Sequence, residues 1–288
     1  MILERDVPLG PLTTYRVGGA AARFARIEDD DDVVQLAAIV REEGVPVLVV
    51  GKGSNLLVAD AGFPGLAVAL GDAFAEVTID GTTVRAGGAT PLPVLARRTA
   101  AAGLRGLEWA VGVPGSVGGG VRMNAGGHGS DIAASLLRVR VFDLATGDDV
   151  VVQAKDLALG YRASAIQPSQ VVLWAELAAE PGDADEAAAE IAEIVRWRRE
   201  HQPGGQNAGS VFTNPEGDSA GRLVDAAGCK GLRIGTAEVS TKHANFIQAD
   251  PDGSADDVLA LIDEVRRRVR EAFGIELHPE VRLVGFDR

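Results

Sequence analysis

The feature that most constrains this chain is a glycine-rich tract, GVPGSVGGGVRMNAGGHG, at residues 112–129. Within it, four glycines and one serine follow Pro114 in six positions. A run of this kind adds little side-chain surface to a core, and each glycine loses much conformational entropy on folding. We therefore predict a loop across which a large ligand lies, such as a nucleotide or a flavin. The alternative is a purely structural glycine hinge.

Composition and charge exclude several classes of protein. The chain has 28 Lys and Arg against 41 Asp and Glu, a net charge of −13, which argues against nucleic acid or an anionic membrane as a partner. A local nest of N–H groups can still bind an anionic small molecule. Cys229 is the single cysteine, so the sequence excludes an internal disulfide and a cysteine-based metal site. No spacing of His, Asp or Glu suggests a metal site either.

Length and hydropathy set further limits. At 288 residues the chain is long enough for two or three domains. The start, MILERDVPLG, lacks the basic and apolar regions of a secretory signal. No apolar run reaches the roughly 18 residues of a membrane span. We therefore expect a cytoplasmic protein without membrane insertion.

The first part of the chain alternates helix and strand. Residues 30–43 are predicted to form a helix, with Asp30 or Asp31 capping its start and Gly44 after its end. VPVLVVG at 45–51 follows as an apolar run typical of a strand buried on both faces. This β–α–β opening leads into a glycine-rich loop.

Predicted strands dominate the middle of the chain. One β-hairpin is expected around the turn at 80–81, and a second joins residues 136–144 to 149–153. A further strand is expected at 171–177, and a helix begins near Thr90. This block is therefore predicted to be α+β.

Two amphipathic helices are predicted after a boundary at PGDADE, residues 181–186, one over 184–201 and one over 254–274. Ser254 suits the start of the second helix and Gly274 its end. Its apolar stripe consists of Val258, Leu261, Ile262, Val265, Val269 and Phe273.

The segment GKGSNLLV, at 51–58, is the first candidate binding motif. It follows a predicted strand, its small residues let backbone N–H groups point at a phosphate, and Ser54 and Asn55 add side-chain donors. It is not a P-loop, because the lysine precedes the second glycine, and it lacks the third glycine of a Rossmann fingerprint. A simple glycine turn is the alternative.

Four polar residues stand out in segments of small or apolar residues. They are Arg162 in GYRAS, Ser210 in NAGSVFTNP, His243 in KHANF and Glu280 in HPEVRLVGF. Each has an ordinary alternative: a surface arginine, an ST-turn, a hydrogen-bonded loop and a solvated glutamate. Their order after a phosphate-type loop and a glycine tract is more informative than any one residue.

With its motifs in this order, the chain resembles the UDP-N-acetylenolpyruvoylglucosamine reductases, the flavoenzymes of bacterial peptidoglycan precursor synthesis. The matching segments follow the family's order across nearly the whole chain. They are TTYRVGG (13–19), GKGSNLLV (51–58), GLEWAVGVPGSVGGGVRMNAGGHG (106–129), GYRAS (160–164), AGSVFTNP (208–215), AGRLVDAAGCKGLRIGTAEVSTKHANFI (220–247) and GIELHPEVRLVG (274–285).

The resemblance implies an α+β protein, with a two-lobed FAD-binding fold of the vanillyl-alcohol-oxidase (PCMH) type and a C-terminal α+β substrate-binding domain. We expect an N-terminal α/β lobe over 1–57, a second lobe over 58–182 and a UDP-sugar-binding domain over 183–288. A monomer is expected. The family's role implies functions in cell-wall biogenesis, cell shape, cell division and the cell cycle.

The resemblance also implies the reaction of a flavin-dependent oxidoreductase that acts on a CH–CH donor with NADP. NADPH reduces FAD, and NADP leaves. UDP-N-acetylglucosamine enolpyruvate then enters the same pocket and receives the hydride at its terminal methylene carbon, C3. Negative charge develops at C2 and spreads into the carboxylate, and the product is UDP-N-acetylmuramate.

Three residues match the family's catalytic positions. Arg162 offers the fixed charge and fork geometry that suit the carboxylate, and Glu280 in its neutral form could hydrogen-bond the same group. Ser210 matches the proton donor to C2. FAD contacts are implied for Gly51, Lys52, Gly53, Ser54, Asn55, Gly112, Pro114, Gly115, Ser116, Gly119, Gly120 and Asn124, and substrate contacts for Tyr161, Asn214 and His243.

The sequence departs from the family's pattern at three places. Thr213 stands where many members have lysine, and His128 stands where an aromatic residue is common. The stretch 163–183 is short, as in the type that lacks an extra substrate-covering loop. Two other functions stay open. One is an oxidase of alcohols or sugars on the same fold, which needs no serine proton donor; the other is a non-catalytic nucleotide-binding module.

Overall fold

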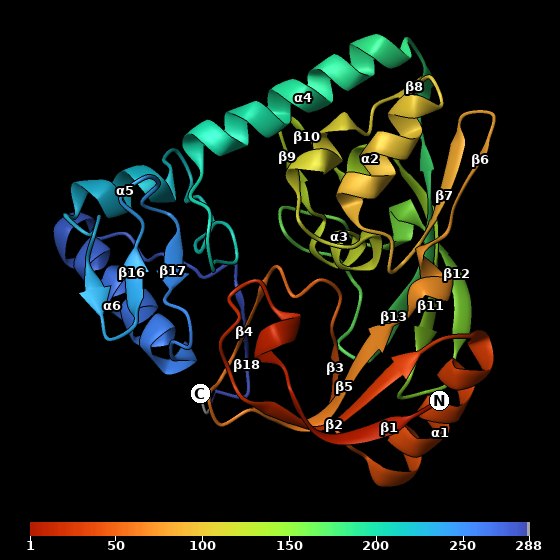
Figure 1. The fold of residues 1–288 in the computed structure, drawn as a ribbon, viewed down its shortest axis with the longest axis horizontal. Coiled ribbons are helices and arrows are strands. Elements are labelled where there is room, and N and C mark those ends of the chain that lie inside the picture. Colours follow the sequence, from red (N-terminus) through yellow and green to blue (C-terminus); the bar gives the residue numbers. More distant parts are fainter. Residues whose placement is uncertain (287–288) are drawn as a thin grey trace. The chain divides into compact units, whose positions relative to one another are not determined.

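The computed structural model describes residues 1–286 (Figure 1). These residues form two compact units. Unit 1 consists of Met1–Arg5, Arg23–Lys52 and Gly65–Arg198; unit 2 consists of Asp6–Ala22, Gly53–Pro64 and the described chain from Arg199 onward. None of the helices within residues 1–286 has both the length and the apolar character needed to cross a membrane.

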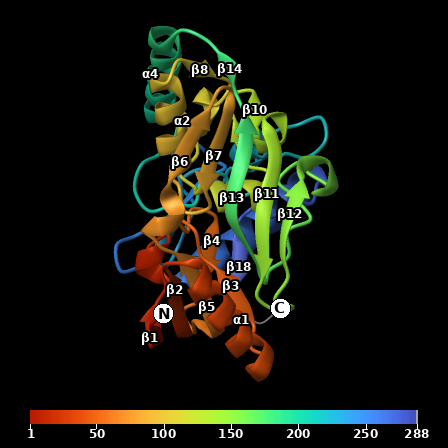
Figure 2. The ribbon, with the colours of Figure 1, turned by 90° about the vertical axis from the view of Figure 1, so that its right-hand side faces the viewer.

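The main sheet of unit 1 is antiparallel and has the order β12–β11–β13–β7–β6 (Figure 2). Both predicted hairpins are confirmed, and Gly81 takes the turn with φ +56°. The strands are β6 (Val77–Asp80), β7 (Thr83–Gly87), β11 (Leu136–Asp143), β12 (Asp149–Gln153) and β13 (Gln170–Ala178).

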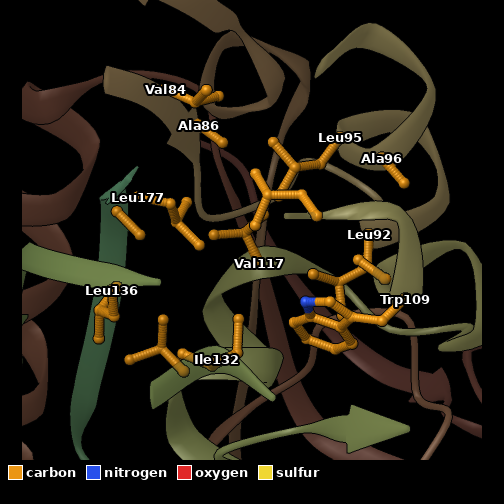
Figure 3. Packing of buried hydrophobic residues seen from close by; sticks show 14 of the residues in the cluster. Val84, Ala86, Leu92, Leu95, Ala96, Trp109, Val117, Ile132, Leu136 and Leu177 are labelled. Atoms are coloured by element: carbon orange, nitrogen blue, oxygen red, sulfur yellow. The ribbon is translucent and has the colours of Figure 1, made fainter. Parts of the chain in front are cut away.

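Three helices contribute to the largest core of unit 1. They are α2 (Leu92–Ala101), α3 (Val117–Met123) and α4 (Ala184–His201). Figure 3 shows side chains of α2, α3, β7 and β13 in this core, with the ring of Trp109 among them. The predicted helix 184–201 is confirmed, and its Ile191 and Ile194 are buried in this cluster.

A second sheet, with the order β1–β2–β5–β3, packs with helix α1 (Asp30–Glu43), whose predicted bounds are confirmed. The predicted cap, Asp30 or Asp31, is wrong: both lie in the first turn, and the cap is Asp29, whose carboxylate accepts a hydrogen bond from the N–H of Asp32 at 2.8 Å. Gly44 closes the helix as predicted, with φ +62°. The strands are β1 (Leu3–Pro8), β2 (Ala20–Ile27), β3 (Val47–Val49) and β5 (Phe63–Leu70).

The prediction that 45–51 forms a strand buried on both faces is only partly right. Residues 47–49 form β3, but all three are half-buried. The reason is topological: β3 is the last strand in its sheet and pairs with β5 alone. An apolar run gives no information about whether its strand lies inside a sheet or at an edge.

The prediction that the glycine tract is a loop is wrong, because helix α3 lies inside it. Ser116 caps α3, its hydroxyl accepting a hydrogen bond from the N–H of Gly119 at 3.4 Å. A Cβ atom on Gly118 would lie 3.2 Å from the carbonyl oxygen of Gly88 and 3.3 Å from that of Val172. The glycines therefore let the helix approach β13 and the end of β7 closely, which offsets their entropic cost.

Unit 2 surrounds a single hydrophobic cluster, to which α6 contributes most of its predicted stripe. Phe273 is the exception: it was predicted in the stripe, but it is 39% exposed at the last position of the helix. The elements of unit 2 include β4 (Leu56–Val58) paired in parallel with β18 (Arg282–Val284), the sheet β15 (Arg233–Ile234), β16 (Ala237–Val239) and β17 (Ile247–Ala249), and helices α5 (Ala220–Ala226) and α6 (Ala255–Phe273).

Short elements complete the described chain. The remaining strands are β8 (Leu104–Arg105), β9 (Gly126–Gly127), β10 (Ser130–Asp131) and β14 (Glu180–Pro181), and single 3₁₀ turns lie at Gly10–Leu12, Asp72–Ala75, Glu108–Gly112, Ile132–Ala134 and Ala154–Asp156.

Candidate functional site

A cleft in unit 1 lies where β3 ends, next to the start of α3 and of β13. Its empty space, about 580 Å³, includes the open solvent at its mouth. Its lining includes the four residues Val49–Lys52 and the cap of α3, Ser116. The others are Leu70, Gly88, Ala89, Gly118, Gly119, Arg122, Ile166, Gln170, Val171 and Val172.

The charge of this cleft is opposite to that of the whole chain. Among the described residues that line it, Lys52 and Arg122 carry a charge, and both are cations. The chain as a whole has a net charge of −13. A local pair of cations on an acidic protein favours an anionic ligand at this place.

Gly51 and Lys52 line the cleft and begin the segment 51–55, whose residues from Gly53 onward belong to unit 2. Within residues 1–286, none of the segment's five N–H groups donates a hydrogen bond to another protein group. Successive N–H groups of this kind form an anion-binding surface. Glycine is required at position 53, where φ is +59° and a Cβ would lie 2.1 Å from the carbonyl oxygen of Leu12. A Cβ on Gly51 would lie 2.5 Å from the hydroxyl oxygen of Ser116.

The first amides of α3, in contrast, are already bonded within the protein. The N–H of Val117 donates to the carbonyl of Thr90 at 2.8 Å, and that of Gly118 donates to the carbonyl of Gly88 at 2.9 Å. The N–H groups of Val117 and Gly118 are therefore not available to a ligand. Of the tract residues predicted to contact FAD, Ser116 and Gly119 line the cleft, whereas Gly112, Pro114, Gly115, Gly120 and Asn124 are outside its lining.

Arg122 and Gln170 line the cleft although the sequence analysis did not select them. Arg122 lies one turn after Gly118 and Gly119 on α3, so its place becomes visible once the tract is known to be helical. Gln170 begins β13 next to Val171 and Val172, and nothing in its local sequence distinguishes it.

Arg162 lies in unit 1 at the tip of a tight turn. Its guanidinium donates hydrogen bonds to the carbonyl oxygens of Asn124 at 3.4 Å and Gly126 at 3.0 Å, and it lies 5.1 Å from the ring centre of Tyr161. Tyr161 itself is 61% exposed, so its side chain is accessible to a substrate.

Ser210 and Glu280 lie on adjacent segments of unit 2. The N–H of Glu280 donates to the carbonyl of Val211 at 2.7 Å, directly after Ser210. The side chain of Asn245 pairs with the backbone of Phe212 on the same segment, donating to its carbonyl at 2.9 Å and accepting from its N–H at 3.0 Å. Because Arg162 belongs to unit 1, the convergence of all three predicted catalytic residues stays a prediction.

The backbone of Glu280 is also tied to the first candidate motif. The side-chain amide of Asn55 donates to the carbonyl of Glu280 at 3.1 Å, and the N–H of Arg282 donates to the carbonyl of Asn55 at 2.9 Å. The parallel pairing of β4 with β18 continues this contact. The position of Glu280 is therefore set by the strand that follows the segment 51–55.

The predicted substrate residues Asn214 and His243 have defined partners in unit 2. Asn214 accepts a hydrogen bond from the N–H of Ala220 at 3.0 Å, at the start of α5. The Nδ1 atom of His243 accepts from the N–H of Asn245 at 3.2 Å, which leaves the proton on Nε2. Burial lowers the pKa of His243, so it is a neutral donor near pH 7.

Two of the three departures from the family's pattern, Thr213 and His128, also have defined partners. Thr213 bonds the carbonyl of His278 through its N–H at 3.0 Å and its hydroxyl at 3.3 Å. His128 packs edge-on against Trp197 at 5.2 Å between ring centres, and its pKa is lowered by burial and then by the charge of Arg198. The guanidinium of Arg198 donates to the carbonyl of Gly112, which fixes α4 to the glycine tract.

No group of three or more His, Cys, Asp or Glu side chains within residues 1–286 is arranged to hold a metal ion. The single cysteine, Cys229, is buried. Its pKa is raised by burial, which is typical of an inert structural thiol.

Comparison with known proteins gives a consistent result. The family model for the FAD binding domain matches residues 21–153, and the model described as UDP-N-acetylenolpyruvoylglucosamine reductase, C-terminal domain, matches residues 200–284. Together they confirm the predicted fold class, an FAD-binding fold followed by the C-terminal domain of these reductases.

Similar proteins match over nearly the full length. The UDP-N-acetylenolpyruvoylglucosamine reductase of Paramagnetospirillum magneticum is 44% identical over 98% of this chain and 92% of its own length. That of Synechococcus sp. strain CC9311 is 44% identical over 99% of this chain and 94% of its own. The crystal structure of the reductase from Thermus caldophilus superimposes with a TM-score of 0.86 at 38% identity, covering 99% of each chain.

Proposed function

Because the chain belongs to the UDP-N-acetylenolpyruvoylglucosamine reductase family, we propose that it reduces UDP-N-acetylglucosamine enolpyruvate to UDP-N-acetylmuramate with NADPH as hydride donor. Membership makes it a flavin-dependent oxidoreductase of peptidoglycan synthesis. The observation that carries the proposal is 44% identity to such reductases over 98% of the chain. The three-part division at 57/58 and 182/183, the monomeric state and the cytoplasmic location stay predictions.

The cleft of unit 1 fits an anionic dinucleotide cofactor. FAD, when bound, supplies a centre that accepts hydride from the nicotinamide and passes it on. The unused N–H groups of Gly51 and Lys52 would contact its pyrophosphate, with Lys52 and Arg122 neutralising charge. The FAD contacts of Gly53, Ser54 and Asn55 stay predictions. Ser116 and Gly119 would form the wall of the cleft next to Gly51. We infer that the remaining tract residues, Gly112, Pro114, Gly115 and Gly120, shape this wall without lining the cleft.

Three side chains would act on the enolpyruvyl group. Arg162 would bind the carboxylate through its planar fork and stabilise the negative charge that spreads into it as hydride arrives at C3. Glu280, in its neutral form, would donate a hydrogen bond to the same carboxylate. Ser210 would hold the proton that is transferred to C2. Tyr161, Asn214 and His243 are proposed to contact the rest of the substrate.

Anaerobic spectroscopy of the purified protein tests this function. We expect NADPH to bleach the flavin absorbance and UDP-N-acetylglucosamine enolpyruvate to restore it. Absorbance that returns only with oxygen would indicate the oxidase alternative. A protein that binds no flavin after reconstitution would indicate a non-catalytic module.

Replacement of Ser210 by alanine tests the proton donor. Ser210→Ala should leave flavin reduction by NADPH unchanged and slow reoxidation by the substrate about 100-fold or more, in the range of general acid catalysis. Ser219→Ala is the matched control. It removes the cap of α5 in the same unit but no proton donor, so it should reoxidise at the wild-type rate. Reoxidation of Ser210→Ala at the wild-type rate would eliminate the proposed role.

A further inference from the structure

The turn that carries Arg162 has an unfavourable backbone conformation. Gly160 and Ala163 exchange two backbone hydrogen bonds, of 3.0 and 3.2 Å, which leaves Tyr161 and Arg162 at the tip. Arg162 has φ +55°, in the left-handed region that non-glycine residues rarely adopt. A residue in this conformation persists only where surrounding contacts hold it.

Asn124 provides such contacts from the end of α3. Its side chain is buried, and its Nδ2 donates to the carbonyl of Gly160 at 3.0 Å and to the carboxylate of Asp131 at 3.2 Å. Its Oδ1 accepts from the N–H of Ala133 at 2.9 Å. The side-chain amide thus connects the end of α3 to residues 131–133 and to Gly160, the first residue of the turn.

The same residue also contacts the arginine directly. The backbone carbonyl of Asn124 accepts one of the hydrogen bonds from the Arg162 guanidinium, and it can do so because Asn124 is itself left-handed, with φ +39°. Asparagine tolerates this conformation better than most residues. Asn124 therefore holds the turn through its side chain and the guanidinium through its backbone.

We propose that Asn124 is a positioning residue, whose side-chain amide fixes the 160–163 turn so that Arg162 presents its guanidinium to the substrate carboxylate in one orientation. The inference rests on the proposed function, because it takes Arg162 as the carboxylate-binding group. The predicted contact of Asn124 with FAD stays a separate prediction, but the partners of its side-chain amide favour the positioning role. Both ends of its amide are engaged by Gly160, Asp131 and Ala133.

Two variants separate the side chain from the backbone. Asn124→Gly keeps the left-handed conformation but removes the amide. Asn124→Asp keeps the acceptor for Ala133 but loses both donors and adds a negative charge beside Asp131. Thr146→Ala is the control, because it removes a side-chain hydrogen bond from an exposed turn of the same unit.

In rapid-mixing kinetics, both Asn124 variants should keep FAD bound and be reduced by NADPH at the wild-type rate. Reoxidation by the enolpyruvyl sugar should slow about 10- to 100-fold, as for a small misplacement of a substrate-binding group. Thr146→Ala should match the wild type in both steps. Loss of FAD from Asn124→Gly, or wild-type reoxidation, would overturn the proposal.

A double variant tests whether Asn124 acts through Arg162. If it does, Asn124→Gly combined with Arg162→Lys should reoxidise no more slowly than Arg162→Lys alone, because residues that act as a unit are not additive. If the double variant loses as much rate as the losses of the two single variants multiplied together, Asn124 acts independently of Arg162 and the proposal is overturned.

Limited proteolysis provides a readout that does not depend on activity. Trypsin should cleave after Arg162 faster in Asn124→Gly than in the wild type or Thr146→Ala, with the site identified by mass spectrometry. Unchanged cleavage would mean that Asn124 does not hold the turn. If cleavage increases while Arg162→Lys reoxidises normally, the positioning of the turn stands and the proposed function of Arg162 is the part that fails.

Discussion

His243 is a residue whose burial affects the pH dependence of stability. Its pKa in the folded protein is lowered by burial, whereas the unfolded chain has the ordinary histidine pKa of about 6.5. Between these two values the unfolded state binds more protons than the folded state. The contribution of His243 to stability is therefore complete above pH 6.5 and is lost as the pH falls through the folded pKa.

We expect His243→Gln to weaken this pH dependence. Urea unfolding, followed by circular dichroism, would be compared at about pH 7.5 and pH 5.5, one unit on either side of the ordinary pKa. The wild type should lose more free energy of unfolding over this interval than the variant, which has no group to protonate at this site. Equal losses in both proteins would show that protonation of His243 is not linked to folding.

Individual residues of the candidate site were predictable where their chemistry is local. The segment 51–55 could be selected because a glycine-rich turn after a strand has few backbone partners of its own. The role of Asn124 could not be predicted, because its partner Gly160 is far away in sequence. For the same reason, nothing in the sequence near Asn55 indicates its contact with Glu280.

At the scale of elements, periodicity predicted the long helices well, although the cap of α1 was predicted one or two residues too late. Helices α1, α4 and α6 each have an apolar face that is repeated often enough to stand out from the background. Helix α3 was missed because its glycines favour a loop reading, whereas the close approach of Gly118 to the backbone of Gly88 and Val172 depends on parts of the chain distant in sequence. Tertiary packing overrides propensity in such a case.

The start of α6 depends on a carboxylate from a distant part of the chain. Asp60 accepts hydrogen bonds from the N–H groups of Ala255 at 3.0 Å and Asp256 at 3.2 Å, and from the hydroxyl of Ser254 at 2.5 Å. A negative charge at this place also interacts favourably with the helix dipole. Asp60 therefore connects the longest helix of unit 2 to the segment 53–64.

We predict that Asp60→Ala destabilises the protein by about 1–2 kcal/mol, the upper range for the loss of a helix cap. The measurement is the urea midpoint from circular dichroism at neutral pH. Glu216→Gln is the control, since it removes one exposed negative charge from the same unit without affecting a cap. A midpoint for Asp60→Ala equal to that of the control would mean that Ser254 alone is sufficient to cap the helix.

At the scale of the whole molecule, the two units have separate hydrophobic clusters, although the chain passes repeatedly from one to the other. The sequence provides one intrinsic probe for each unit. All three tryptophans, Trp109, Trp174 and Trp197, belong to unit 1, and the single cysteine, Cys229, is buried in the cluster of unit 2. Tryptophan fluorescence therefore reports unfolding of unit 1, and thiol labelling reports exposure of unit 2.

These probes allow the effect of Asp60→Ala to be assigned to one unit. Because the clusters share no residues, we expect each unit to unfold as a cooperative body of its own. In urea, the midpoint of Cys229 labelling should fall in the variant, while the midpoint of tryptophan fluorescence stays at its wild-type value. A parallel fall of both midpoints would contradict the expectation. In that case the chain crossings at 5–6, 22–23, 52–53, 64–65 and 198–199 would be sufficient to make both units unfold together.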